Sequence, residues 1–141
     1  MLADIKASAD LVLIDAPCTG TGTWRRNPDA KWRIRPGALE VRLKTQAEVL
    51  DRASHLVKPG GRIAYVTCSV LPAENGGQIR QFLDRHPDFA VVPPSETVAA
   101  LWDKADDFTA ATLQSPEGLL MTPRRTGTDG FFVSVLRKQA S

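Results

Sequence analysis

Residues 10–23 read Asp-Leu-Val-Leu-Ile-Asp-Ala-Pro-Cys-Thr-Gly-Thr-Gly-Thr, and this stretch decides the fold class. Its first part places a continuous apolar run, residues 11–14, between two acids. Such a run predicts a strand covered on both faces, as in a parallel α/β sheet. The residues that follow combine a proline and two glycines with small hydroxyl side chains, which predicts a loop at the carboxyl end of the strand. Open α/β sheets hold their chemistry at that end.

Helix and strand signals alternate along the rest of the chain. From Pro36 to Val57, apolar residues recur every three or four positions and predict an amphipathic helix, with Pro36 in its first turn. Residues 58–61 end that helix, residues 62–67 predict a second strand, and residues 73–85 a second helix whose inward side chains are Ile79, Phe82 and Leu83. After a short apolar run at 89–92 and an irregular middle, residues 119–123 and 131–136 predict an antiparallel hairpin with Asp129-Gly130 as its turn.

The composition is that of one folded, soluble domain. Of the 141 residues, 43% are hydrophobic and 24% charged, and the net charge of +2 does not by itself demand a polyanionic partner. No stretch reaches the roughly 18 apolar residues that span a bilayer, and no secretory signal is present, so we expect a cytoplasmic protein and no membrane partner. His55 and His86 show no ligand spacing with the cysteines, so we expect no metal.

Cys18 and Cys68 each follow a predicted strand, and one crossover helix separates the two strands. A right-handed crossover places such strands side by side or nearly so, and both sulfurs then face one cleft beside Asp15. Composition leaves three interpretations open: a disulfide, a reactive pair, or two small buried side chains.

Three motifs carry a resemblance to a known family. Residues 15–33 (Asp-Ala-Pro-Cys-Thr-Gly-Thr-Gly-Thr-Trp-Arg-Arg-Asn-Pro-Asp-Ala-Lys-Trp-Arg) and 65–75 (Tyr-Val-Thr-Cys-Ser-Val-Leu-Pro-Ala-Glu-Asn) resemble the cysteine motifs of the Sun-type (RsmB-like) RNA cytosine-carbon-5 methyltransferases. Residues 127–132 resemble that family's C-terminal hairpin. The resemblance covers nearly the whole chain. It implies the C-terminal half of a Rossmann-like class I methyltransferase sheet, an α/β fold with parallel strands, crossover helices and a C-terminal antiparallel hairpin.

The chemistry of that family explains its cysteines. Carbon 5 of cytosine becomes nucleophilic only after a group adds to carbon 6, and a thiolate adds well. The resemblance implies that Cys68 is this nucleophile and that Cys18 assists breakdown of the adduct. The swapped assignment is the main rival, because DNA cytosine methyltransferases use the Pro-Cys thiol. Asp15 would bind the cytosine edge or, with Pro17, border the site of S-adenosyl-L-methionine (AdoMet).

Further motif residues are candidates for RNA contact. A basic stretch with interleaved tryptophans suits phosphate binding and base stacking, or else forms a solvated loop with two half-buried tryptophans. Asp129 and Gly130 either line the base pocket or form a hairpin turn, and Glu74-Asn75 either begins a helix or supports the Cys68 loop. The basic stretch contains Trp24, Arg25, Arg26, Lys31, Trp32, Arg33 and Arg35.

The principal AdoMet motif has no counterpart here. An AdoMet-dependent Rossmann enzyme binds its cofactor mainly through a glycine-rich turn after its first strand. The only glycine-rich loop here, residues 20–22, follows the Pro-Cys motif and belongs to the substrate side. We therefore expect residues 1–141 to be a single partial catalytic domain without its upstream AdoMet motif or RNA-recruiting domain, and to be inactive or weakly active alone. We also expect the unpaired edge of strand 11–14, or the adjoining helix face, to be buried against another copy or a partner chain.

Two other function classes compete with a methyltransferase. One is a non-catalytic RNA-binding remnant of the family, which would show salt-dependent RNA affinity without a covalent adduct. The other is a thiol redox protein, although the cysteines lack Cys-X-X-Cys spacing. Within the family reading, the resemblance implies ribosomal RNA as the usual substrate, with transfer RNA second.

Overall fold

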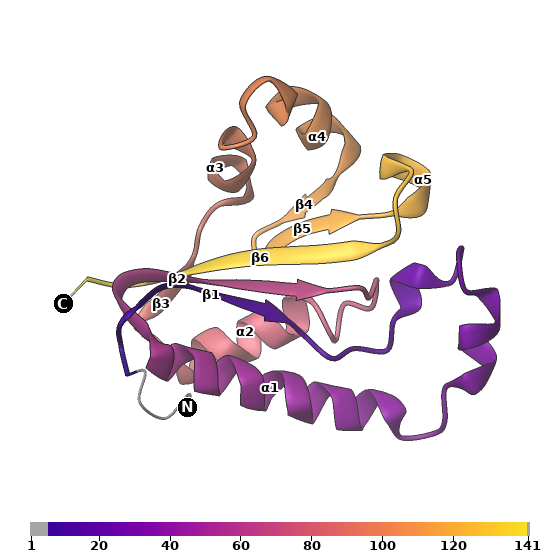
Figure 1. Ribbon diagram of the computed structural model, residues 1–141, viewed down its shortest axis with the longest axis horizontal. Helices are drawn as coiled ribbons and strands as arrows, with labels where there is room; N and C mark the ends of the chain where they lie inside the picture. The colour runs from indigo at the N-terminus through magenta and orange to yellow at the C-terminus, as the bar shows by residue number, and fades with distance from the viewer. Residues whose placement is uncertain (1–5, 141) are drawn as a thin grey trace.

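The computed structural model describes residues 6–140, which fold around one mixed β-sheet (Figure 1). The strand order is β1-β2-β6-β5-β4, and β3 pairs with β6 as well. β1 and β2 are parallel, whereas the β2–β6, β3–β6, β5–β6 and β4–β5 pairs are antiparallel. The strands are β1 (Ala9–Asp15), β2 (Val57–Thr67), β3 (Phe89–Val91), β4 (Leu113–Ser115), β5 (Gly118–Met121) and β6 (Phe131–Lys138).

Helices lie on both sides of the sheet in Figure 1. The longer helices α1 and α2 cover one face, and α3 and α4 lie over the other face beside β5 and β6. No helix in the described part of the chain is long and apolar enough to cross a membrane. The helices are α1 (Ala38–Leu56), α2 (Gly76–Arg85), α3 (Pro94–Ala99), α4 (Ala105–Ala111) and α5 (Pro123–Thr126), with short 3-10 turns at Thr21–Thr23, Pro28–Arg33 and Trp102–Lys104.

The two predicted helices are confirmed, with different starting points. α1 begins after Gly37, whose φ of 80° is in the left-handed region, so Pro36 lies outside the helix. It buries Leu50 against the sheet core. α2 begins at Gly76 rather than Ala73, because residues 72–75 form a turn of their own, and it buries Ile79 and Phe82 as predicted.

β1 and β2 are parallel neighbours, as the crossover argument predicts. Ile14 pairs with Tyr65 and Asp15 with Val66, so the carboxyl ends of both strands lie at the same edge of the sheet. β2 starts at Val57, directly after α1, which is earlier than predicted. This register brings the segments after the two strands together.

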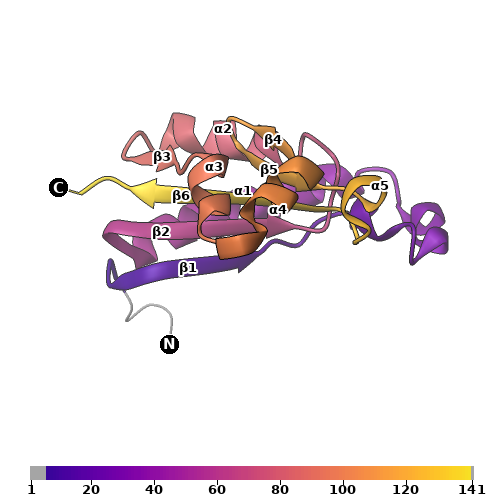
Figure 2. The same cartoon turned by 90° about the horizontal axis from the view of Figure 1, so that it is seen from above.

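The expectation that β1 is covered on both faces is wrong for the described residues. Val12 and Ile14 pack on the core, but Leu11 and Leu13 on the opposite face are 58% and 68% exposed. The helices on that face, α3 and α4, pack against β5 and β6, and the outer face of β1 stays uncovered. Figure 2 shows this face from above. β1 is also an edge strand, so an apolar strand face and an unpaired edge occur together.

The predicted C-terminal hairpin is confirmed, but its predicted turn is wrong. β5 and β6 pair antiparallel, with Leu119 opposite Val133. The reversal uses α5 and then Gly127, which has a φ of 69°, rather than a tight Asp129-Gly130 turn. Gly130 is instead held by another loop. The tight hairpin joins β4 to β5, and β5 overlaps the strand predicted at residues 119–123. β4, α3 and α4 lie in the middle segment that the sequence patterns left irregular.

Candidate active site

The two cysteines meet at the carboxyl ends of β1 and β2. Cys18 Sγ lies 3.2 Å from Cys68 Sγ, although 50 positions separate the residues in sequence. A disulfide bond is about 2.0 Å long. Both cysteines are free and partly exposed. The structure therefore shows two thiols in hydrogen-bond contact, rather than a disulfide or two fully buried side chains.

This contact makes the two thiols unequal. The hydrogen bond from Cys68 lowers the pKa of Cys18 to about 7, while partial burial opposes ionisation. The same hydrogen bond, together with burial, raises the pKa of Cys68. As the pH rises through about 7, the pair loses its first proton, and the remaining proton is shared in the hydrogen bond between the two sulfurs. Cys68 gains thiolate character when its proton moves to Cys18.

Buried hydroxyl and amide groups hold the backbone around Cys68. Thr67 Oγ1 donates to Asn75 Oδ1 at 2.6 Å, and Asn75 Nδ2 donates to the Ser69 carbonyl at 2.9 Å. On the other side, the hydroxyls of Ser69 and Thr21 lie 3.0 Å apart. Asn75 therefore supports the Cys68 loop, which was one of its two predicted roles.

The Glu74 side chain takes neither of its predicted roles, because it binds the loop of Cys18 rather than that of Cys68. Its side chain is fully buried and lies in the turn before α2, so it does not begin the helix. Its carboxylate accepts hydrogen bonds from Thr19, the residue after Cys18. Sequence patterns indicate only a short polar segment here. They do not reveal that the tertiary structure buries the Glu74 side chain.

Two glycines join three segments behind the cysteine pair. Gly22 N donates to the Cys68 carbonyl at 2.9 Å, and Gly130 N donates to the Gly22 carbonyl at 2.8 Å. A Cβ on Gly22 would lie 2.1 Å from the Gly130 oxygen. The glycine-rich loop thus belongs with the cysteines, and Gly130 is buried in this junction.

The predicted RNA-contact residues lie mostly at the surface, and two of them pair. The Arg26 guanidinium donates to Asp129 Oδ2 at 2.9 Å, so the loop after Cys18 is tied to the segment before β6. Lys31 lies 4.8 Å from the ring centroid of Trp32, which is 81% exposed and so not half-buried. Arg25 is exposed, and Arg33 pairs with Asp29.

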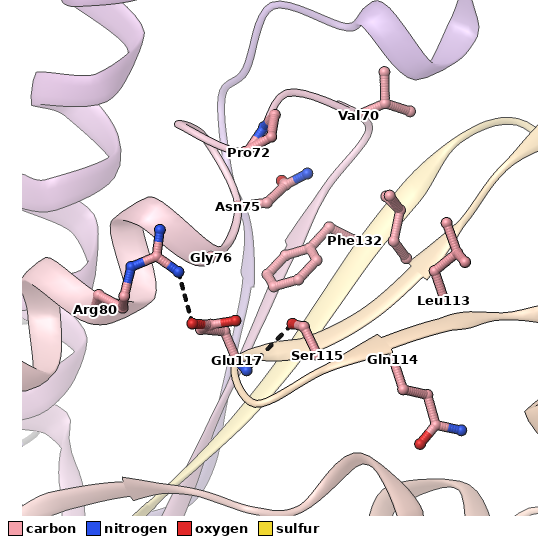
Figure 3. Close-up of a pocket in the computed structure, with 11 residues that line it drawn as sticks. Val70, Pro72, Asn75, Gly76, Arg80, Leu113, Gln114, Ser115, Glu117 and Phe132 are labelled. Atoms are coloured by element: carbon pink, nitrogen blue, oxygen red, sulfur yellow. Dashed lines mark hydrogen bonds and ion pairs between the residues drawn. The ribbon is translucent and has the colours of Figure 1, made fainter.

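A cavity of about 230 Å³ lies beside the Cys68 loop (Figure 3). The loop after Cys68, the start of α2 and the β4–β5 hairpin form its walls. Arg80 and Glu117 pair across one side at 2.6 Å. Its lining is Val70, Pro72, Asn75, Gly76, Arg80, Leu113, Gln114, Ser115, Glu117, Leu120 and Phe132, and the sequence motifs did not indicate it.

Comparisons with known proteins identify the family. The family model described as "16S rRNA methyltransferase RsmB/F" matches residues 2–137. The chain belongs to the RsmB/F family of rRNA methyltransferases. This membership confirms the resemblance to Sun-type RNA methyltransferases and the Rossmann-like fold class.

Individual relatives and solved structures agree with this family assignment. The chain is 42% identical over 130 residues to ribosomal RNA small subunit methyltransferase B of Cronobacter sakazakii, covering 92% of this chain and 26% of the relative. The crystal structure of PH0851 superposes with a TM-score of 0.76 at 38% identity, covering 94% of this chain and 27% of that one. A methyltransferase homologue from Pyrococcus horikoshii gives a TM-score of 0.67 at 25% identity, over 97% and 41%. The chain therefore spans about a quarter of the curated relative's length.

Methyltransferases generally use AdoMet, which the family resemblance predicts beside Asp15 and Pro17. Asp15 is exposed at the end of β1, and Pro17 follows in the same loop. The loop at residues 20–22 does not fit a cofactor cradle, because Gly22 is packed on Gly130 and Cys68. Among residues 6–140, no three side chains cluster as metal ligands.

Proposed function

We propose that this chain is the cysteine-bearing part of an enzyme that methylates carbon 5 of cytosine in RNA, with Cys68 as the nucleophile. The observation that carries the proposal is the pair of free thiols 3.2 Å apart at the ends of two parallel strands. Family membership supports ribosomal RNA as the substrate.

In the first step, the Cys68 sulfur forms a bond to carbon 6 of cytosine. Its proton moves to the Cys18 thiolate along the existing hydrogen bond, so the attacking sulfur carries a full lone pair. The electrons of the carbon 5–carbon 6 double bond shift toward carbon 5 and the ring. The exposed Asp15 carboxylate accepts a hydrogen bond from the exocyclic amine and orients the base.

The second step returns the cysteine. AdoMet, when bound, would supply the methyl group that carbon 5 takes. Cys18, after losing its proton to solvent, removes the carbon 5 proton, the double bond re-forms, and the carbon 6–sulfur electrons return to Cys68. Cys18 can reach the adduct because its sulfur lies 3.2 Å from that of Cys68.

The residues proposed to hold RNA lie in the loop after Cys18 and in the segment before β6. Exposed cations bind phosphates, and an exposed indole stacks on an unpaired base. The Arg26–Asp129 pair links the proposed RNA loop to the strand that lies next to β2. The substrate-binding set is Arg25, Arg26, Lys31, Trp32, Arg33, Asp129 and Gly130, and the cofactor-bordering pair is Asp15 and Pro17.

One observation favours the swapped roles, and one experiment decides between them. Cys18 has the lower pKa, as a nucleophile would. We would incubate the chain with AdoMet and an RNA that carries 5-fluorocytosine, whose fluorine blocks the final proton removal, and map the protein–RNA adduct by mass spectrometry. Cys68→Ser should abolish the adduct, whereas Cys18→Ser should still form it at Cys68 but more slowly, because the Cys68 proton must then pass to solvent.

The same experiment tests the second candidate function. An adduct mapped to Cys18 in the wild-type chain would reverse the two roles. RNA binding without any adduct would fit both the expected inactivity of this chain alone and the non-catalytic RNA-binding protein, which the exposed Trp32 and its basic neighbours also support. Rapid, reversible formation of a Cys18–Cys68 disulfide as the only chemistry would favour the thiol redox class.

A further inference from the structure

Glu74 is a buried acid that the proposed reaction does not use. Its side chain is 0% exposed, and no Lys or Arg in the described residues forms an ion pair with it. Acids are rarely buried without a cation, because removing the charge from water is costly. We propose that Glu74 is a positioning residue that holds Cys18 at its working distance from Cys68. This proposal rests on the cysteine chemistry proposed above.

Hydrogen bonds connect the Glu74 carboxylate to the residues on both sides of Cys18. Oε1 accepts from Thr19 N at 2.8 Å, and Oε2 accepts from Thr19 Oγ1 at 2.6 Å. Oε1 also accepts from Gln46 Nε2 at 3.0 Å, and the same Gln46 nitrogen donates to the Pro17 carbonyl at 3.0 Å. Residue 19 is thus tied directly, and residue 17 through a buried side chain of α1.

The backbone of Glu74 belongs to the segment that holds Cys68. Its carbonyl accepts from the buried Tyr65 hydroxyl at 2.7 Å, which anchors the turn to β2. The next residue, Asn75, bonds to Thr67 and to Ser69 on either side of Cys68. One short turn therefore fixes both cysteine loops, and Glu74 is the link between them.

A carboxylate suits this position because it only accepts hydrogen bonds. Three donors from Thr19 and Gln46 converge on its two oxygens. A glutamine could still accept from Thr19 N and Gln46, and the freely rotating Thr19 hydroxyl could accept from its amide. Glu74→Gln would keep the link and remove the charge, whereas Glu74→Ala would remove both.

The charge and the link have different consequences for Cys18. The negative charge of Glu74 opposes ionisation of Cys18, and the hydrogen bond from Cys68 favours it more strongly. Glu74→Gln should therefore lower the pH midpoint of Cys18 ionisation. Glu74→Ala should raise the midpoint toward that of a free cysteine, because the loop no longer holds Cys18 against Cys68. A residue that only stabilised the fold would produce neither shift.

The test uses two readouts that need neither RNA nor AdoMet. The first is the rate of Cys18 alkylation by iodoacetamide against pH, mapped by mass spectrometry. The second is the rate at which diamide, a thiol oxidant, converts the pair to a disulfide. Relative to wild type, Glu74→Ala should slow disulfide formation at least about tenfold, since small misplacements of reacting atoms have effects of that size. Glu74→Gln should keep the wild-type rate within a factor of about two, because it keeps the loop in place.

Two further variants keep the proposal falsifiable. Leu50→Ala is a matched control that lowers stability from the core without touching either cysteine loop, and it should leave both readouts as in wild type. Thr19→Val removes one of the three hydrogen bonds and should give an intermediate disulfide rate even if Glu74→Ala fails to fold. Wild-type midpoints and rates in a folded Glu74→Ala protein would overturn the proposal. If Glu74→Ala does not fold, wild-type midpoints and rates in Thr19→Val would overturn it. Failure of the methyltransferase mechanism would appear separately, in the RNA adduct experiment.

Discussion

Replacing Gly22 with alanine tests the packing behind the cysteine pair. An added Cβ would lie 2.1 Å from the Gly130 oxygen, 2.7 Å from its carbonyl carbon and 2.8 Å from the Cys68 oxygen. Real Cβ atoms essentially never approach other atoms within 3.0 Å. All three neighbours are backbone atoms of two other segments, those of Gly130 and Cys68, so no flexible side chain can move aside. The loop itself must shift, by about 1 Å, to relieve the overlap.

The expected cost follows from what that shift breaks. The hydrogen bonds from Gly22 N to Cys68 and from Gly130 N to Gly22 are both lost or lengthened. Each such bond contributes about 1 kcal/mol, and the strain of overpacking adds about 1 to 3 kcal/mol. We expect Gly22→Ala to lower the free energy of unfolding by about 3 to 5 kcal/mol. The Cys68 carbonyl moves with the loop, so the contact between the sulfurs should weaken too.

Urea unfolding and Cys18 alkylation against pH measure the two effects separately. Gly60→Ala is the matched control, because a Cβ there meets nothing within 4 Å although its φ is 78°. The left-handed backbone alone should cost that variant about 1 to 2 kcal/mol, with no change in the Cys18 alkylation midpoint. A Gly22→Ala protein that unfolds like wild type and keeps the wild-type midpoint would refute the close-packing argument.

Three other predictions concern the cysteines and the surface. Alkylation of Cys18 should be faster than that of Cys68 and should rise as pH increases through about 7, since the reactive thiolate forms as the proton is lost; equal rates mapped by mass spectrometry would contradict this. Leu13→Lys, on the exposed face of β1, should change the free energy of unfolding by less than about 0.5 kcal/mol and reduce the self-association expected at that edge; sedimentation of the wild-type chain as a strict monomer would contradict that expectation. Arg26→Ala should change the free energy of unfolding by no more than about 1 kcal/mol, because its ion pair is exposed. Trp32→Ala should weaken RNA binding by about 1 to 3 kcal/mol without affecting the free energy of unfolding. Unchanged RNA titrations for both variants would remove this loop from the proposed interface.

Local sequence patterns determined the framework of the site. Both cysteines follow strands that the sequence predicts, one after the apolar run before residue 15 and one after the strand that ends at Thr67. The helical period within residues 36–57 predicts the crossover that makes these strands parallel. These patterns are readable because a strand and a helix repeat their buried positions with fixed periods. The motifs themselves led to the family that the comparisons show. The predictions that the chain is a partial domain and that it is inactive alone remain predictions.

Patterns failed where a contact between distant segments decided the structure. The Asp129-Gly130 dipeptide predicted a tight turn, yet Gly130 is held by Gly22 and the reversal is made by α5 and Gly127. The continuous apolar run of β1 predicted two covered faces, yet Leu11 and Leu13 are exposed, because whether a strand face is covered depends on where other helices pack. A local pattern records what a segment prefers and carries no information about its neighbours in space.

The sequence alone thus determined an α/β sheet with a thiol after each of two strands, and the type of chemistry those thiols suit. Only the tertiary structure decided that the sulfurs lie 3.2 Å apart, that Cys18 carries the lower pKa, and that Glu74 joins the two loops. The physical reason is that these properties depend on distances between residues about 50 positions apart, which the register of β1 against β2 sets. Hydrogen bonds and pKa values change over fractions of an ångström, which the spacing of residues along a chain does not specify.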